Sequence, residues 1–153
     1  MQMCCGWKEL MPGYKEPDEA NERQDPHSVE QRILGSMLID PSCVGTVLER
    51  LEPEEFNCVW HREIFLGISA LHRMGRPVDC LTLCDCLVQI NSLVANECDD
   101  YLVYLVNTTV TSANIPEDIR NLKAARREQM EKIHRIRQLR DELRRLTGSD
   151  EDV

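Results

Sequence analysis

Residues 26–38, which read PHSVEQRILGSML, decide the fold of this chain. Their apolar side chains recur at the three- and four-residue intervals of one helix face, and these are Val29, Ile33, Leu34, Met37 and Leu38. Ser28 followed by Gln31 has the spacing of a capping box, which predicts a helix start near Ser28. Gly35 leaves room for a close neighbour on the same face.

Four further short helices are predicted between this segment and residue 115. Asp40 and Pro41 end the first helix and open the second, since Asp caps well and Pro is tolerated at the first helical position. The third covers about residues 60–74, the fourth begins near Thr82, and the fifth begins at Asp99 or Asp100. The sequence therefore predicts an all-α domain over residues 26–115, a compact bundle of about five short helices.

Residues 116–147 predict one long basic amphipathic helix that projects from the bundle. Asn114 and Glu117 form a capping pair before it, and nothing afterwards breaks a helix of about 30 residues, roughly 45 Å long. An apolar seam along it predicts a partner or oligomer surface, and its members are Ile119, Leu122, Met130, Ile133, Ile136, Leu143 and Leu146.

The two ends of the chain carry no helical periodicity. Residues 1–25 contain two prolines and several acids, so they are predicted to form a mobile arm. Residues 148–153 form an acidic tail.

The net charge of −9 is unevenly distributed. Residues 1–115 hold eight Lys/Arg against 18 Asp/Glu, whereas residues 116–147 hold ten against six. Any phosphate contact is therefore expected late in the chain, where Arg137, Arg140 and Arg144 share a stripe. A solvated face balanced by neighbouring acids is the favoured alternative.

Other polar residues are given structural roles. The eight cysteines are expected to be free thiols in a reducing compartment. Cys80, Cys84 and Cys86 lack the paired spacing of a zinc site, and His61 has no catalytic partner placed by sequence. Asp79 and Thr82 suit a helix cap. We predict no catalytic, cofactor or metal residues.

No apolar run approaches the roughly 20 residues that span a bilayer, and the first ten residues are too polar for a signal peptide. The chain is expected to be cytoplasmic.

The order of short motifs resembles the amino-terminal domain of DnaB-type replicative DNA helicases. The opening helix resembles the family's "P…E-Q-x-x-L-G-x-x-L" pattern. Five further blocks follow in the family's order. They are Glu54-Glu55-Phe56, His61 with Ile64-Phe65, Gly75 to Asp79 with Thr82, Tyr101-Leu102 with Leu105, and Ser112 to Ile115. The resemblance implies a helical domain that forms dimers or a hexamer collar and receives primase or loader proteins.

The chain departs from this family in two ways. Asp118 and Asn121 are polar where the family has apolar residues, and no returning helix follows to form a hairpin. The ATPase domain is also absent, since seven glycines include no Gly-Lys pair of a P-loop.

Three hypotheses remain open. The first is a non-enzymatic replication module that binds itself, a helicase, a primase or a loader. The second is a detached or truncated helicase segment that works only with a separate ATPase chain. The third is a nucleic-acid-binding coiled-coil protein.

Overall fold

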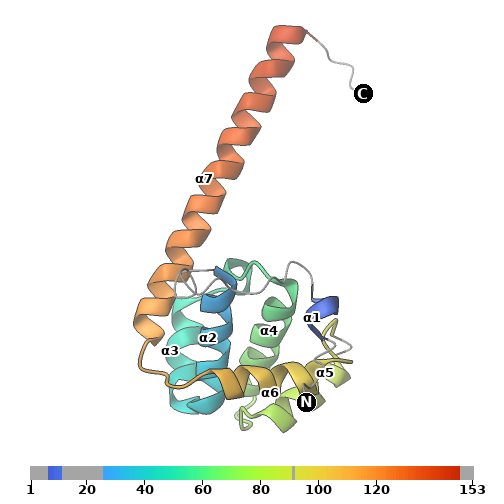
Figure 1. Ribbon diagram of the computed structural model, residues 1–153, viewed down its shortest axis with the longest axis vertical. Coiled ribbons are helices and arrows are strands. Elements are labelled where there is room, and N and C mark those ends of the chain that lie inside the picture. Colours follow the sequence, from blue (N-terminus) through green and yellow to red (C-terminus); the bar gives the residue numbers. More distant parts are fainter. Residues whose placement is uncertain (1–6, 12–25, 91, 149–153) are drawn as a thin grey trace.

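The computed structural model describes residues 7–11, 26–90 and 92–148. The described residues form seven α-helices, two short 3-10 helices and no strand, so the predicted all-α fold is confirmed. Figure 1 shows a bundle from which α7 projects. The elements are α1 (Trp7–Leu10), α2 (Pro26–Ile39), η1 (Pro41–Cys43), α3 (Val44–Arg50), η2 (Pro53–Glu55), α4 (Val59–Arg73), α5 (Cys80–Gln89), α6 (Cys98–Thr108) and α7 (Ile115–Thr147).

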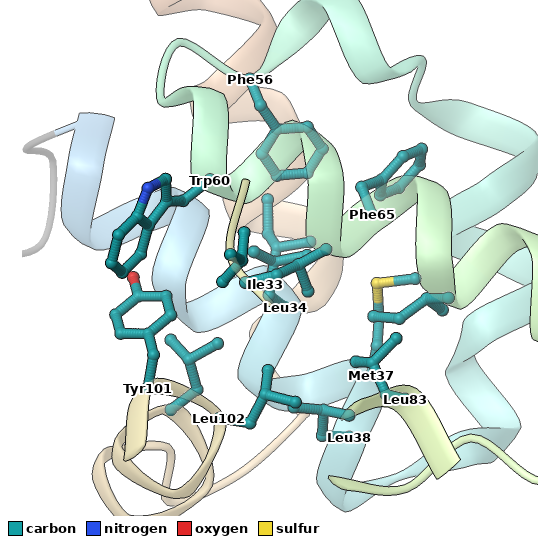
Figure 2. Close-up of a cluster of buried hydrophobic side chains, with 14 of the residues drawn as sticks. Ile33, Leu34, Met37, Leu38, Phe56, Trp60, Phe65, Leu83, Tyr101 and Leu102 are labelled. Atoms are coloured by element: carbon teal, nitrogen blue, oxygen red, sulfur yellow. The ribbon is translucent and has the colours of Figure 1, made fainter. Parts of the chain in front are cut away.

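Helix α2 lies at the centre of the bundle, where it packs against α4, α6 and the beginning of α7. Ile33, Leu34 and Met37 are fully buried. Figure 2 shows these α2 side chains between Phe56 and Phe65 on one side and Leu102 on the other. Each such side chain contributes about 1.5–3 kcal/mol through burial, so the apolar face of residues 26–38 does organise the fold.

Gly35 allows α6 to approach α2 closely. A Cβ atom at this position would lie 1.9 Å from Oγ1 of Thr109 and 2.9 Å from the carbonyl oxygen of Leu105. Both distances are shorter than van der Waals contact, so only glycine fits. The prediction of a close neighbour at Gly35 is confirmed.

Two of the predicted helix caps are confirmed. Asp40 accepts a hydrogen bond from the backbone N–H of Ser42 at 3.2 Å and caps η1, whose first residue is Pro41. Asp79 caps α5 by accepting from the backbone N–H of Thr82 at 2.9 Å.

The starts of α2 and α5 and the cap of α7 differ from those predicted. Helix α2 begins at Pro26, two residues before the expected cap, and the Gln31 amide donates to the Tyr101 hydroxyl instead. Helix α5 begins at Cys80 rather than near Thr82, and Asn114 precedes α7 without a side-chain capping bond. Sequence spacing can identify two polar residues that could cap a helix. It cannot show that a distant residue, here Tyr101, takes one of their hydrogen bonds instead.

The prediction of a mobile arm over residues 1–25 is wrong for residues 7–11. Helix α1 places Trp7 against α6, with its ring centroid 4.6 Å from that of Tyr101 and 4.7 Å from that of Tyr104. Trp7 and Met11 are only 1% and 4% exposed. A four-residue helix is too short to show periodicity, so the sequence pattern missed it. The rest of the arm and residues 149–153 lie outside the described residues.

The first two turns of α7 belong to the bundle. Ile115, Ile119 and Leu122 are buried, and buried Asp118 accepts a hydrogen bond from Arg32 on α2 at 3.1 Å. The domain boundary predicted at residue 115 therefore lies too early. None of the described helices combines the length and apolarity needed to span a bilayer.

Candidate functional site

The projecting part of α7 is the first candidate site. Its last described polar contacts with the bundle are Lys123 Nζ with Glu55 Oε2 at 2.9 Å, and Arg126 Nη1 with Asn57 Oδ1 at 3.4 Å. Beyond Arg126 every residue of α7 is exposed except Ile133, which is half-buried. This part, residues 127–147 and hereafter the rod, extends about 30 Å from the bundle at 1.5 Å per residue (Figure 1).

The predicted apolar seam divides into two parts. Ile119 and Leu122, which were predicted as partner surface, are 0% and 1% exposed. That prediction is wrong for these two residues, because the bundle already covers them. Met130, Ile133, Ile136, Leu143 and Leu146 all lie on the rod.

The structure adds Leu139, which sequence reasoning missed. It is 50% exposed, comparable with Ile136 at 55%. Its spacing of three residues from Ile136 and four from Leu143 was the signal that could have found it.

One face of the rod carries most of its exposed apolar area. At about 100° per residue, four side chains fall within roughly 80° of one another around the helix axis. We call these four the distal strip, and they are Ile136, Leu139, Leu143 and Leu146. Ile133 and Met130 lie about 60° and 120° to one side of Ile136. The seam therefore winds around the rod, and only the distal strip forms a continuous surface.

The three predicted phosphate contacts share a neighbouring face. Arg137, Arg140 and Arg144 lie within about 60° of one another, on the side of Ile136 away from the distal strip. Arg144 is 3.7 Å from Asp141, and both side chains are more than 60% exposed. An exposed pair of this kind is worth about 0–1 kcal/mol, so Arg144 remains accessible to an anion.

A buried polar cluster forms the second candidate site. His61 on α4 is fully buried, with Nδ1 2.7 Å from Glu30 Oε1 and Nε2 2.5 Å from the Tyr101 hydroxyl. Glu30 also accepts the backbone N–H groups of Asn57 and Cys58. These bonds connect α2, α4 and α6 inside the core.

The cluster favours a charged imidazole. Burial alone would lower the pKa of His61, but hydrogen bonds to Cys58 and Glu30 raise it to about 9. In the charged form both ring N–H groups donate, one to the Glu30 carboxylate and one to the Tyr101 oxygen. Burial would raise the pKa of the Cys58 thiol, yet the hydrogen bond with His61 lowers it.

The arrangement suits structure better than catalysis. His61 and Glu30 are 0% exposed, so a substrate could not reach either without opening the bundle. Sequence reasoning gave His61 a structural role but missed Glu30 as its partner. Glu30 stands in a polar run, Glu30-Gln31-Arg32, where a charged residue ordinarily faces water.

Two groups of side chains in the described part of the chain bring together residue types that can ligate a metal ion. One consists of His27, Cys58 and His61, and the other of Cys84, Cys98 and Asp99. Within each group the ligand atoms lie within 4.8 Å of one another.

Comparison with known proteins connects the bundle with one family. The family model described as DnaB-like helicase N terminal domain matches residues 23–124. The match therefore ends where α7 leaves the bundle, and the rod lies beyond it.

Curated relatives give the same result. The replicative DNA helicase DnaB of Nostoc sp. is 33% identical over 99 residues, which are 63% of this chain and 11% of that helicase. The replicative DNA helicase DnaC of Bacillus subtilis is 31% identical over 100 residues, 64% of this chain and 22% of the helicase. The chain thus spans only a small part of these relatives, and only their helicase N-terminal region is matched.

A solved structure supports the same fold. The crystal structure of the N-terminal domain of DnaB helicase from Mycobacterium tuberculosis superimposes with a TM-score of 0.62 at 30% sequence identity. The similarity covers 72% of this chain and 81% of that domain.

Proposed function

Because this chain belongs to the family of DnaB-like helicase N-terminal domains, we propose that it is an interaction module of DNA replication. It associates with itself and docks a DnaB-type helicase, a primase or a loader protein. The observation that carries the proposal is the distal strip, where four large apolar side chains are at least 50% exposed on a helix that leaves the bundle.

The size of the distal strip indicates how tightly it binds. The four side chains of one strip are 50–77% exposed, so their complete burial contributes about 4–7 kcal/mol, and a pair of rods that buries both strips gains about 7–15 kcal/mol. Association costs about 4–15 kcal/mol in lost freedom. Two rods alone therefore pair weakly, and a partner that supplies additional apolar surface binds more tightly.

Charge supports the same use of the rod. The rod carries seven Lys/Arg against four Asp/Glu, whereas residues 1–115 are strongly acidic. A basic rod and an acidic bundle are complementary between copies of the chain, and complementary charge speeds association and fixes orientation.

The test is sedimentation of the full chain and of a Leu139→Glu/Leu143→Glu double variant. We expect the wild-type chain to shift toward a larger mass with concentration and the variant to stay monomeric. Gln138→Glu, on the same part of the rod, is the matched control and should behave as wild type. A wild-type chain that stays monomeric and captures neither a DnaB-type helicase nor its primase contradicts the proposal.

A second candidate function is that of a helicase segment that works with a separate ATPase chain. The observation in its favour is the small part of each relative that the chain covers, 11% and 22% for the two helicases above. The test is reconstitution. A separately expressed RecA-like ATPase domain should gain DNA-unwinding activity when this chain is added, and an unchanged rate excludes this function.

A third candidate, nucleic-acid binding, rests on the face formed by Arg137, Arg140 and Arg144. Binding through three phosphates should weaken by roughly the third power of salt concentration. Between 50 and 200 mM salt the affinity for a labelled oligonucleotide should fall by about one decade or more. Fluorescence anisotropy measures this fall. Absence of binding at the lowest salt removes the candidate.

A further inference from the structure

Two cysteines and an aspartate from different helices meet at the junction of α5 and α6. Cys84 lies in the middle of α5, and Cys98 and Asp99 form the first turn of α6. The Cys84 thiol donates a hydrogen bond to Asp99 Oδ1 at 3.1 Å, and the Sγ atom of Cys98 lies within 4.8 Å of both ligand atoms.

This geometry is close to that of a metal site. Zinc binds thiolate sulfur at about 2.3 Å and carboxylate oxygen at about 2.0–2.2 Å with tetrahedral angles. Ligand atoms around one zinc ion are therefore roughly 3.3–3.8 Å apart. The 3.1 Å between Cys84 Sγ and Asp99 Oδ1 is already near these values, and Cys98 Sγ, within 4.8 Å of both atoms, has to move by about 1 Å or less.

Burial and access also suit a bound ion. Cys84 and Cys98 are 6% and 3% exposed, whereas Asp99 lies at the surface. Two buried sulfur ligands would shield the ion from water, and the exposed carboxylate gives it a route into the site. Cys80 is half-buried one turn before Cys84. Burial and the nearby charges of Asp79 and Asp99 raise the pKa of its thiol.

We propose that Cys84, Cys98 and Asp99 bind a thiophilic divalent cation of the zinc class and thereby fasten α5 to the start of α6. Binding converts the two thiols to thiolates and releases two protons to solvent, and Asp99 ligates as the carboxylate. Water or Cys80 completes four-coordination. The fold does not require the ion, because α5 and α6 already contact each other and both bury apolar side chains, among them Leu83, Leu87 and Leu102.

The electrostatics of the metal-free cluster are consistent with cation binding. Burial raises the pKa of the Cys84 thiol, and the neighbouring Cys98 and Asp99 raise it further. A second anion is thus unfavourable there until a positive ion is present. Metal affinity should accordingly increase with pH.

The other group with ligand geometry is less suitable. His61 already uses both ring nitrogens, for Glu30 and for Tyr101. A metal at His61 would have to displace one of these buried partners, which leaves a polar group unsatisfied. In the group of Cys84, Cys98 and Asp99 a bound ion replaces both ends of the thiol-to-carboxylate bond, and the Cys98 thiol gives up its 3.3 Å bond to the Ala95 carbonyl, which is only half-buried.

The test is titration of the reduced full chain with Co²⁺, read by absorption, and with Zn²⁺, read by thermal unfolding. We expect two signals from bound Co²⁺. One is a thiolate-to-cobalt charge-transfer band in the near ultraviolet, and the other is the set of visible absorption bands of a tetrahedral ion. Zinc at about 100 times its dissociation constant should raise Tm by roughly 5–10 °C.

Variants assign the signal to residues. Cys84→Ala and Cys98→Ala should each weaken binding by roughly 100-fold or more, and Asp99→Asn by roughly 10-fold or more. Asp99→Asn changes an exposed side chain, so it stays informative if the cysteine variants unfold. Cys43→Ala and His27→Gln are the controls and should bind as wild type.

Two results would overturn the proposal. One is the absence of a thiolate charge-transfer band in the folded wild-type chain. The other is a band that survives Cys84→Ala or Asp99→Asn unchanged but disappears in His27→Gln, which would place the ion in the His61 cluster.

Discussion

At Gly35 the crossing of α2 and α6 depends on a single missing methyl group. We expect Gly35→Ala to lower the free energy of unfolding by about 1–3 kcal/mol, because the new Cβ would overlap Thr109 and the Leu105 carbonyl. The gain in helix propensity of about 1 kcal/mol is too small to offset this. Urea unfolding followed by circular dichroism measures the change.

Gly45 provides the matched control. A Cβ there would have only the His72 ring as a neighbour, at 3.9 Å, which is ordinary contact. Gly45→Ala should therefore leave stability unchanged or raise it by up to about 1 kcal/mol. Equal destabilisation of both variants would contradict the account of a tight crossing at Gly35.

His61 gives a pH dependence with a defined sign. Its pKa is raised from 6.5 to about 9 in the folded chain, so its contribution to stability is complete below pH 6.5. The contribution is lost as the pH rises through about 9, and amounts to roughly 3 kcal/mol. Cys58 has the opposite sign in this range, because hydrogen bonding with His61 lowers its pKa.

The direct measurement is an NMR titration of the His61 imidazole. Wild type should titrate near pH 9, and Glu30→Gln should titrate lower because the carboxylate charge is gone while the side chain keeps its size. A midpoint near 6.5 in the wild-type chain would show that the cluster does not hold a charged imidazole.

Individual residues were predictable from sequence where one local rule decides them. Asp40 and Asp79 cap helices because a carboxylate can reach the N–H of a residue two or three positions later. Glu30 was not predictable, since its partner His61 is 31 positions away. Cys98 likewise meets Cys84 only after α6 has folded against α5.

At the scale of elements, Arg32 and Asp118 link α2 to the start of α7. Arg32 Nη2 lies 3.1 Å from Asp118 Oδ1, and the two side chains are 27% and 5% exposed. A double-mutant cycle with Arg32→Gln and Asp118→Asn should give a coupling free energy of about 1–3 kcal/mol. Denaturant unfolding of the four proteins supplies the values.

The pair formed by Lys123 and Glu55 serves as the comparison. It joins α7 to η2 at 2.9 Å, but its side chains are 36% and 21% exposed. The same cycle with Lys123→Gln and Glu55→Gln should give less than about 1 kcal/mol. A larger coupling here than for Arg32 and Asp118 would mean that burial does not control these links.

The order of helices was predictable, whereas the role of the start of α7 was not. Apolar periodicity identified the bundle helices because each buries one face, and the same periodicity marked Ile119 and Leu122. The pattern cannot say which surface covers an apolar residue, so it assigned these two to a partner. Asp118 is polar where the family has an apolar residue, and Arg32 satisfies its charge inside the bundle.

At the scale of the whole molecule, the bundle should be stable without the rod. A chain that ends after Arg126 keeps the contacts of Lys123 and Arg126 with the bundle. We expect its free energy of unfolding to match that of the full chain within about 0.5 kcal/mol, because the residues removed are almost all exposed. Circular dichroism should show less helix but an unchanged unfolding midpoint.

If the rods of two copies associate, the free energy of unfolding of the full chain depends on protein concentration. The full chain should then gain stability as its concentration rises, while the shortened chain should not. Lower stability of the shortened chain at every concentration would show that the rod contributes to the folded monomer.

Helix α7 runs without interruption from the bundle into the rod. A protein that binds the far end of the rod therefore acts on the bundle through a rigid lever. The short arm of that lever lies in the core at Ile119 and Leu122, next to α2. A sideways displacement at Leu146 therefore becomes a torque on the central helix rather than a motion absorbed at a hinge. A protein bound at the tip would set the direction in which the whole domain faces.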